Sequence, residues 1–179
     1  VVKDDSLLGG DAFGIARILA EAIRPLNADL IFCGKTSIDV ENHGTGVALA
    51  VLLGLPHVSA VSKLEWLDDR RIRTEREIEG AVEIVDVSLP AVVTANKGLN
   101  EPRYPSLPGI MKAKKKPIEE VEAAQLGLDP GQVGSDGARL EVVSLEPPPM
   151  RTEGKKFAGE ARESVLSVLK ALREERKLL

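Results

Sequence analysis

Apolar residues recur at helical spacing near the start of the chain and are followed by short continuous apolar runs. Residues 12–26 carry apolar side chains three and four positions apart, and Asp11 stands where a helix cap is expected, which predicts an amphipathic helix. Residues 30–33 are a short apolar run of the kind found in buried parallel strands. Residues 45–53 predict a second helix. Helix, strand, loop and helix in this order indicate an α/β fold.

The pattern changes to strand spacing in the middle of the chain. The segments predicted as strands are residues 61–67, 72–78, 81–87 and 90–95. Residues 68–70 are the turn of a predicted hairpin. Residues 97–110 predict a long loop interrupted by three prolines, and residues 110–116 predict a short helix with a basic end.

The last part of the chain alternates between flexible and regular patterns. Residues 127–138 contain four glycines and one proline and predict a linker, whereas residues 140–145 predict a final strand. Three consecutive prolines then precede an amphipathic helix predicted over residues 160–177. Its apolar stripe comprises Val165, Val168, Leu169 and Leu172. We therefore expect residues 1–150 to form the α/β domain and residues 151–179 a C-terminal helical arm that packs on another chain.

Composition narrows the classes of function. The 179 residues contain 24 basic and 28 acidic side chains, so the net charge of −4 gives no overall attraction to nucleic acid or to an anionic membrane. Aromatic residues make up 3% of the chain, which argues against stacking of bases on aromatic side chains. The single cysteine, Cys33, excludes an internal disulfide and fits a reducing compartment. No apolar run approaches the ~20 residues of a membrane span.

The residues Gly34, Lys35 and Thr36 resemble the end of a phosphate-binding P-loop. That motif needs a glycine five positions before Gly34, where this chain has Asp29. The intervening residues are the predicted strand itself, so no glycine-rich loop precedes the lysine. The sequence therefore does not favour a nucleoside triphosphatase of the P-loop class.

The whole segment from Gly34 to Gly46 supports a different interpretation. It follows a predicted parallel strand and leads into a helix, and ligands of open α/β sheets bind at the carboxyl ends of strands. Amide groups at a helix start suit a phosphate, and Gly44, Thr45 and Gly46 allow close approach and add a hydroxyl donor. The spacing alone fits an ordinary connecting loop equally well. His43 lies in this segment, and neither it nor His57 has a partner at metal-ligand spacing, so we predict no metal site and no catalytic residue.

Four lysines follow the proline-rich loop, at positions 112, 114, 115 and 116. Such a run is commonly a solvated helix end, where lysines suit the helix dipole. It also suits attraction to an acidic protein partner, which speeds association. The loop before it favours the second interpretation, because Leu107 lies between Pro105 and Pro108 and has the character of a docking anchor.

Several ordered segments of this chain closely resemble the beta subunits of the electron transfer flavoprotein family. The resemblance covers roughly residues 8–150. The segments that carry it are Asp29–Ile31, Gly34–Asp39 and Thr45–Gly46, Glu75–Gly80, Leu89–Thr94, Leu99–Tyr104, Leu107–Pro108, and Ile110–Lys116. The family's N-terminal third has no counterpart here. The family often has Asn-Gln-Thr-Gly where this chain has His43 to Gly46.

This resemblance implies a fold and a function. The fold is an α/β domain with a mostly parallel sheet flanked by helices, Rossmann-like and adenine-nucleotide-binding, with an added β-hairpin region and a C-terminal helical arm. The function is that of an electron carrier rather than an enzyme. Together with an alpha subunit, it accepts electrons from flavin-dependent dehydrogenases such as acyl-CoA dehydrogenases, as in fatty acid oxidation, and passes them to a quinone oxidoreductase. The cofactors are an FAD held mainly by the alpha subunit and an AMP bound by this subunit.

Two alternatives remain open at this point. A bifurcating member of the family would bind a second FAD in place of AMP, and a redox-silent module would bind an adenine nucleotide on the same sheet. We expect no nucleic-acid partner and no membrane insertion. The expected location is the cytoplasm, or the mitochondrial matrix in a eukaryote.

The resemblance also assigns residues. The nucleotide is expected at Leu30, Gly34, Lys35, Ile38, Asp39, His43, Gly44, Thr45 and Gly46, with His43, Gly44 and Thr45 cradling the phosphate. Partner proteins are expected at a recognition loop over about residues 95–117 and at one glutamate of a strand. The residues assigned to partners are Glu77, Tyr104, Leu107, Pro108, Lys112 and Lys115. Glu77 matches a glutamate that pairs with an arginine of the alpha subunit.

Overall fold

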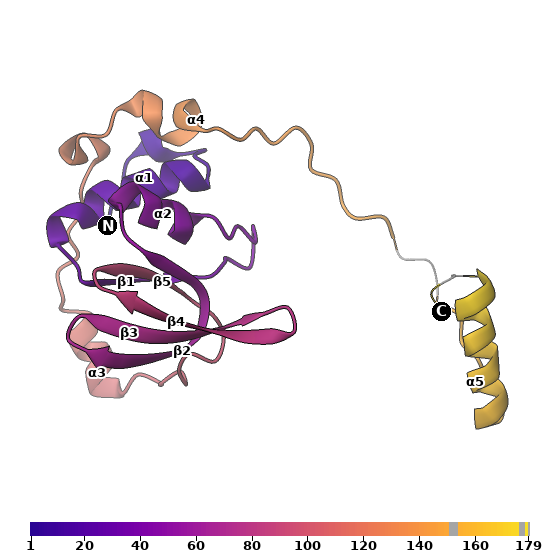
Figure 1. The fold of residues 1–179 in the computed structure, drawn as a ribbon. Helices are drawn as coiled ribbons and strands as arrows, with labels where there is room; N and C mark the ends of the chain where they lie inside the picture. Colours follow the sequence, from indigo (N-terminus) through magenta and orange to yellow (C-terminus); the bar gives the residue numbers. More distant parts are fainter. Residues whose placement is uncertain (151–153, 176–177, 179) are drawn as a thin grey trace. The chain divides into compact units, whose positions relative to one another are not determined.

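The computed structural model describes residues 1–150, 154–175 and 178. The chain divides into two compact units, Val1–Glu141 and Val142–Leu179. The first unit holds the sheet and most of the helices (Figure 1).

A five-stranded sheet organises the first unit. Its strands are β1 (Leu30–Gly34), β2 (His57–Asp68), β3 (Arg71–Ile78), β4 (Ala81–Ser88) and β5 (Ala91–Ala95). Their order across the sheet is β1-β5-β2-β3-β4. The β1–β5 and β5–β2 pairs are parallel, and the β2–β3 and β3–β4 pairs are antiparallel, so every strand except β3 runs in the same direction. The predicted α/β class is therefore confirmed, with the predicted hairpin region as its antiparallel extension.

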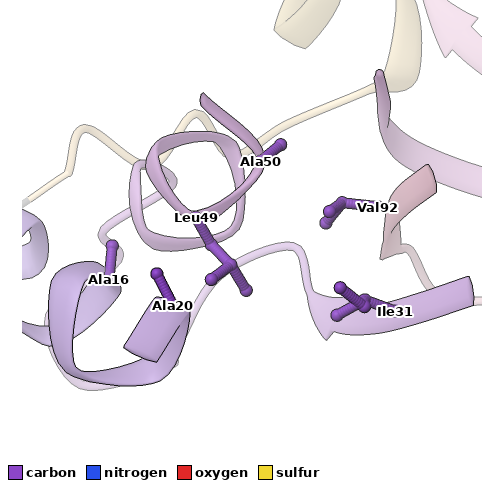
Figure 2. Close-up of a cluster of buried hydrophobic side chains, with 6 residues drawn as sticks. All are labelled: Ala16, Ala20, Ile31, Leu49, Ala50 and Val92. Atoms are coloured by element: carbon purple, nitrogen blue, oxygen red, sulfur yellow. The ribbon is translucent and has the colours of Figure 1, made fainter. Parts of the chain in front are cut away.

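The helices α1 (Ala12–Ile23) and α2 (Thr45–Leu53) pack on one face of the sheet over β1 and β5 (Figure 1). Asp11 caps α1, because its carboxylate accepts the Gly14 N–H at 2.8 Å. Figure 2 shows the core between these elements, with Leu49 of α2 pointing between Ala20 of α1 and the strands. The cluster comprises Ala16, Ala20, Ile31, Leu49, Ala50 and Val92. Small residues on both helices let them approach one another closely.

A second cluster lies on the other side of the same strands and is carried by the antiparallel extension. Its buried members are Val58, Val61, Ile72, Val87, Ala91 and Val93. A bulge interrupts β2 between Val58 and Val61, where Ala60 has a left-handed φ of 59°. Bulges of this kind bend a strand and increase its local twist.

The predicted linker over residues 127–138 is wrong. This segment forms two short helical turns, Pro130–Gln132 and α4 (Gly134–Gly137), and Val133 is fully buried against Ile18. The glycines permit close packing of the backbone, because a Cβ on Gly134 would lie 2.0 Å from the Ser6 carbonyl oxygen and would clash with it. The chain after the sheet thus returns to pack on α1 and on the N-terminal segment.

The helix predicted over residues 110–116 begins earlier in the structure. The helix α3 spans Leu107–Ala113, with Ser106 as its cap. Pro108 fits the first turn, where a missing N–H leaves no hydrogen bond unmade. Leu107 is therefore the first residue of a helix rather than part of the loop predicted over residues 97–110, which corrects the expectation from the sequence.

The second unit contains α5 (Ala161–Lys170), which continues as one π-helical turn to Glu175. Residues 176 and 177 of the predicted helix lie outside the described residues. None of the side chains of α5 is buried. The predicted strand over residues 140–145 is wrong, because these residues form no regular secondary structure and pair with no strand of the sheet.

Candidate functional site

The candidate site lies where β1 and β5 end side by side. The two strands are in parallel register, with Gly34 paired to Ala95. The Lys35 N–H donates to the Ala95 carbonyl at 3.1 Å, so the pairing continues one residue into the loop. Ligands of open α/β sheets occupy this carboxyl edge. The structure therefore places the loop after β1 where a nucleotide site is expected.

The helix α2 starts directly against this edge, and Gly46 is the reason. A Cβ on Gly46 would lie 2.7 Å from the Thr94 Cγ2 and 3.2 Å from the Cys33 Cβ. Any larger residue would push the helix away from β1 and β5. The glycine thus brings the first turn of the helix to the ends of both strands.

The first turn of α2 presents unused amide groups. Gly44 is the cap residue and offers no side-chain acceptor. Within the described residues, the N–H groups of Thr45, Gly46 and Val47 have no acceptor, and the first helical bond runs from the Ala48 N–H to the Gly44 carbonyl. Amides at a helix start, at the positive end of the helix dipole, bind phosphate groups.

The Gly44 N–H, which was expected to bind phosphate, already donates to the Asn42 side chain. The Asn42 Oδ1 accepts the Gly44 N–H at 2.8 Å, so this amide is already engaged. A Cβ on Gly44 would lie 3.1 Å from the same Oδ1. Asn42 was not among the predicted site residues, although an asparagine two residues before a glycine is a recognisable turn signal.

The other predicted side chains of this loop are mostly exposed. Lys35 is half-buried, whereas His43 is exposed and Ile38 is 97% exposed. The Asp39 carboxylate accepts the Val40 N–H at 2.9 Å, and hydrogen bonds, first from the Ser37 side chain, hold the pKa of Asp39 below its ordinary value. The loop thus carries both cationic and anionic side chains.

Leu30 lies apart from the other predicted nucleotide residues. It begins β1, at the end of the strand opposite to Gly34, and is paired with Ala91. Its side chain packs against the second hydrophobic cluster. The structure therefore brings together Gly34, Lys35 and the residues up to Gly46, but not Leu30.

Two residues of the edge have structural roles that the sequence did not reveal. Thr94 is 2% exposed, and its Oγ1 accepts the Ala60 N–H at 2.9 Å. Its only signal in the sequence is a polar residue in an otherwise apolar run. Cys33 lies beside Gly46, and burial raises the pKa of its thiol, which favours the neutral, unreactive form.

A cavity of about 250 Å³ lies at the opposite, amino end of β1 and β5. Asp29 and Pro90, which precede the two strands, line it together with the end of α2. No predicted site residue lines this cavity, so it is separate from the carboxyl edge.

A second candidate surface consists of the recognition segment, residues 95–117. It begins where β5 ends and contains α3, whose cap Ser106 accepts the Gly109 N–H at 3.3 Å. Tyr104 is 99% exposed and Leu107 is 73% exposed, and Lys112 and Lys115 are also exposed. Exposed apolar residues beside several cations are typical of a protein-docking surface.

Glu77 lies on β3, opposite Val82 of β4, and is exposed. Within the described residues it forms no salt bridge, whereas Arg73 and Asp86 on the same two strands pair at 2.7 Å. The Glu77 carboxylate is thus available to a cation from outside the chain.

The described residues contain no cluster of three or more His, Cys, Asp or Glu side chains that could hold a metal ion. None of their helices is long and apolar enough to cross a membrane.

Comparison with known proteins shows similarity over nearly the whole chain. The family model for the electron transfer flavoprotein domain matches residues 1–126. The electron transfer flavoprotein subunit beta of Bacillus subtilis is 39% identical over 176 residues, which cover 98% of this chain and 67% of the relative. The mouse protein of the same name is 42% identical over 156 residues, covering 87% of this chain and 58% of the relative. The chain thus spans about three fifths of the length of these relatives.

Proposed function

We propose that this chain, which belongs to the electron transfer flavoprotein domain family, acts as the beta subunit of a two-subunit electron carrier. In this role it pairs with an alpha subunit that holds most of an FAD. The redox chemistry is that of the flavin, and the protein binds and positions it. The family model and the relatives confirm the resemblance found in the sequence, at the level of the family.

The observation that carries the nucleotide part of this proposal is the set of open amides at the start of α2. The N–H groups of Thr45, Gly46 and Val47 have no acceptor among the described residues, and the helix start lies beside the ends of β1 and β5. A phosphate oxygen would satisfy them, and the half-buried Lys35 would add a positive charge from the end of β1. We propose AMP as the ligand, with Gly34 to Gly46 as its loop.

The Asn42 side chain refines this assignment. Because it already accepts the Gly44 N–H, the phosphate is expected on the amides of Thr45 and Gly46 rather than on that of Gly44. Gly44 then serves the site by leaving room beside the phosphate. Thr45, which is half-buried at the helix start, supplies a hydroxyl donor.

The recognition segment supplies the second part of the proposal. Leu107 and Tyr104 would contact flavin-dependent dehydrogenases, while Lys112 and Lys115 attract an acidic surface. Glu77 would pair with a cationic residue of the alpha subunit. A quinone oxidoreductase is the proposed final acceptor of the electrons.

The test is the nucleotide content of the heterodimer made by co-expressing this chain with its alpha subunit. Denaturation and chromatography of the released nucleotides should give AMP and FAD in equal amounts. Gly44→Val should lower the AMP content severalfold and leave the FAD content unchanged, whereas Gly154→Val, at a glycine with open space around it, should change neither.

Other contents would lead to other conclusions. Two FAD molecules and no AMP would identify a bifurcating carrier with a flavin in this loop. An adenine nucleotide without any flavin would identify a redox-silent module. Full AMP content in Gly44→Val would show that the nucleotide does not bind beside this residue.

A further inference from the structure

Asn42 is the least exposed residue of the loop that leads into α2. It is half-buried, whereas the other residues from 36 to 44 are exposed. Its Oδ1 accepts the Gly44 N–H at 2.8 Å. A Cβ on Gly44 would lie 3.1 Å from this oxygen, so the contact depends on a glycine at position 44. The Asn42 side chain and the absence of a side chain at Gly44 therefore act together.

This hydrogen bond interrupts a row of open backbone amides. Within the described residues, the N–H groups of residues 42, 43 and 45–47 have no acceptor. The Gly44 N–H between these two groups is engaged by Asn42, and the Ala48 N–H that follows them donates to the Gly44 carbonyl at 2.9 Å. The open amides at the start of α2 are therefore limited to those of residues 45–47.

The number of adjacent open amides bears on the number of phosphates that the loop can hold. Loops that bind a diphosphate surround both phosphates with a continuous series of backbone N–H groups. A single phosphate is satisfied by the amides at the start of one helix. In this chain the Asn42 Oδ1 occupies the amide that would join the two groups, and this oxygen is an acceptor that repels phosphate oxygens.

We propose that Asn42 makes the nucleotide site selective for a nucleoside monophosphate over a nucleotide that carries a diphosphate. This inference rests on the proposed function, which places the phosphate of AMP at the start of α2. Because the Gly44 N–H is engaged, a second phosphate has no free donor next to the first and meets the Asn42 Oδ1 instead. Asn42 is therefore a specificity-determining residue, which disfavours ADP and FAD at this loop.

The test compares AMP with ADP, because ADP carries a diphosphate but no flavin. Calorimetry measures the affinity of each nucleotide for the heterodimer from which the adenine nucleotide has been removed. We expect the original protein to bind AMP at least tenfold more tightly than ADP. Asn42→Ala frees the Gly44 N–H for a second phosphate and should reduce this preference about tenfold, as expected for one hydrogen bond to a charged group.

The ratio of the two affinities separates selectivity from a loss of structure. If Asn42 only stabilised the loop, Asn42→Ala would weaken AMP and ADP binding in the same proportion. Asn42→Asp keeps an oxygen for the Gly44 N–H and adds a negative charge, so it should weaken both nucleotides and ADP more strongly, because ADP carries more charge. Val40→Ala, at a 72% exposed residue of the same loop, should change neither affinity.

Each outcome has one meaning. A preference for AMP that is unchanged in Asn42→Ala, or an original protein that binds both nucleotides equally, would overturn the inference and leave the proposed nucleotide site intact. If Asn42→Ala does not fold, Asn42→Asp decides, and equal weakening of AMP and ADP in that variant overturns the inference. Binding of neither nucleotide by the original heterodimer would overturn the proposed nucleotide site itself, and the inference with it.

Discussion

Single residues decide how closely α2 approaches the sheet. Gly46 has no side chain, so the helix start touches Thr94 and Cys33. Thr94 in turn accepts the N–H of Ala60, which holds the bulge of β2 in a left-handed conformation that is unfavourable for alanine. The buried hydroxyl therefore supports both the bulge and the carboxyl edge where the nucleotide is proposed to bind.

Thr94→Val tests this support with almost no change in side-chain shape. The variant leaves the Ala60 N–H without its acceptor beside a fully buried core. The free energy of unfolding should fall by about 1–3 kcal/mol, measured by urea denaturation. Thr36→Val, at an exposed threonine, should stay within about 0.5 kcal/mol of the original chain. Equal stability of the two variants would show that the Thr94 hydroxyl is dispensable.

We expect the Asp11 carboxylate to make the stability of the fold depend on pH under acidic conditions. Its carboxylate accepts the Gly14 N–H and the Arg139 N–H, and these two hydrogen bonds, first of all the one from Gly14, lower the pKa of Asp11. The folded chain therefore binds this proton less readily than the unfolded chain. Its contribution to stability is present above the ordinary carboxyl pKa of about 3.9 and is lost as the pH falls through the lowered pKa.

Asp11→Asn should therefore flatten the loss of stability below about pH 4, because the group that takes up the proton is gone. Thermal denaturation between pH 2 and pH 5 measures this slope. Asp69→Asn is the control, since the Asp69 side chain lies in an exposed turn. If both variants show the acid dependence of the original chain, Asp11 does not determine it.

At the scale of elements, local periodicity predicts those helices and strands that are stabilised by residues close together in the sequence. The helix over residues 45–53 and the strand starting at Leu30 were predicted closely, because each carries a continuous apolar pattern with clear ends. The order of strand, loop and helix around the candidate site was predicted for the same reason, whereas the binding roles of the loop residues stay predictions. Asn42 and Thr94 could not be assigned roles in advance, because their partners are fixed only by the folded backbone.

The elements predicted wrongly depend on contacts that sequence patterns do not contain. Gly134 and Gly137 suggested flexibility, but in the structure they permit close contact with Ser6 and Gln132. Residues 140–145 have the composition of a strand, but a strand also needs an edge to pair with. The composition of each segment therefore indicated its local conformational propensity, but it did not indicate which residues the segment would contact in the folded chain.

The apolar stripe of α5 carries a prediction about assembly. Val165→Ser with Leu169→Ser removes the apolar side chains of the stripe, and burial of each is worth about 1.5–3 kcal/mol. We expect the affinity for the alpha subunit, measured by calorimetry, to fall at least tenfold. Glu163→Ser with Lys170→Ser places the same residues on the opposite helix face and should bind normally. If both double variants bind equally, the stripe is not at the interface.

The whole molecule presents two different kinds of surface on one domain. At the carboxyl edge of β1 and β5, the start of α2 has open backbone amides and lies close to both strands because of Gly46, and these features suit a small anionic ligand. The recognition segment begins at the end of β5 and offers exposed apolar and basic side chains, which suit another protein. The proposed nucleotide site and the proposed docking segment thus rest on different residues, so each can be tested by its own substitutions.

Docking to a dehydrogenase should therefore separate into an anchor and a long-range attraction. Leu107, at the start of α3, is 73% exposed, and its burial in a partner pocket favours affinity. Leu107→Ala should weaken dehydrogenase binding by about 1–3 kcal/mol without loss of flavin. Leu26→Ala is a matched control, because Leu26 is 71% exposed but lies outside the recognition segment.

The lysines should act on the association rate, because charge attraction extends over about 10 Å at moderate salt and speeds encounter. Lys112→Ala with Lys115→Ala should slow reduction of the flavin at low ionic strength and flatten its salt dependence in stopped-flow measurements with a partner dehydrogenase. Lys3→Ala with Arg70→Ala changes the net charge equally at exposed positions elsewhere and should keep most of the salt dependence. The docking assignment fails if a partner dehydrogenase reduces the flavin of the Leu107→Ala protein at the original rate at every salt concentration. If the two charge variants behave alike, the lysines contribute only through the overall charge of the chain, and α3 simply ends in solvated lysines.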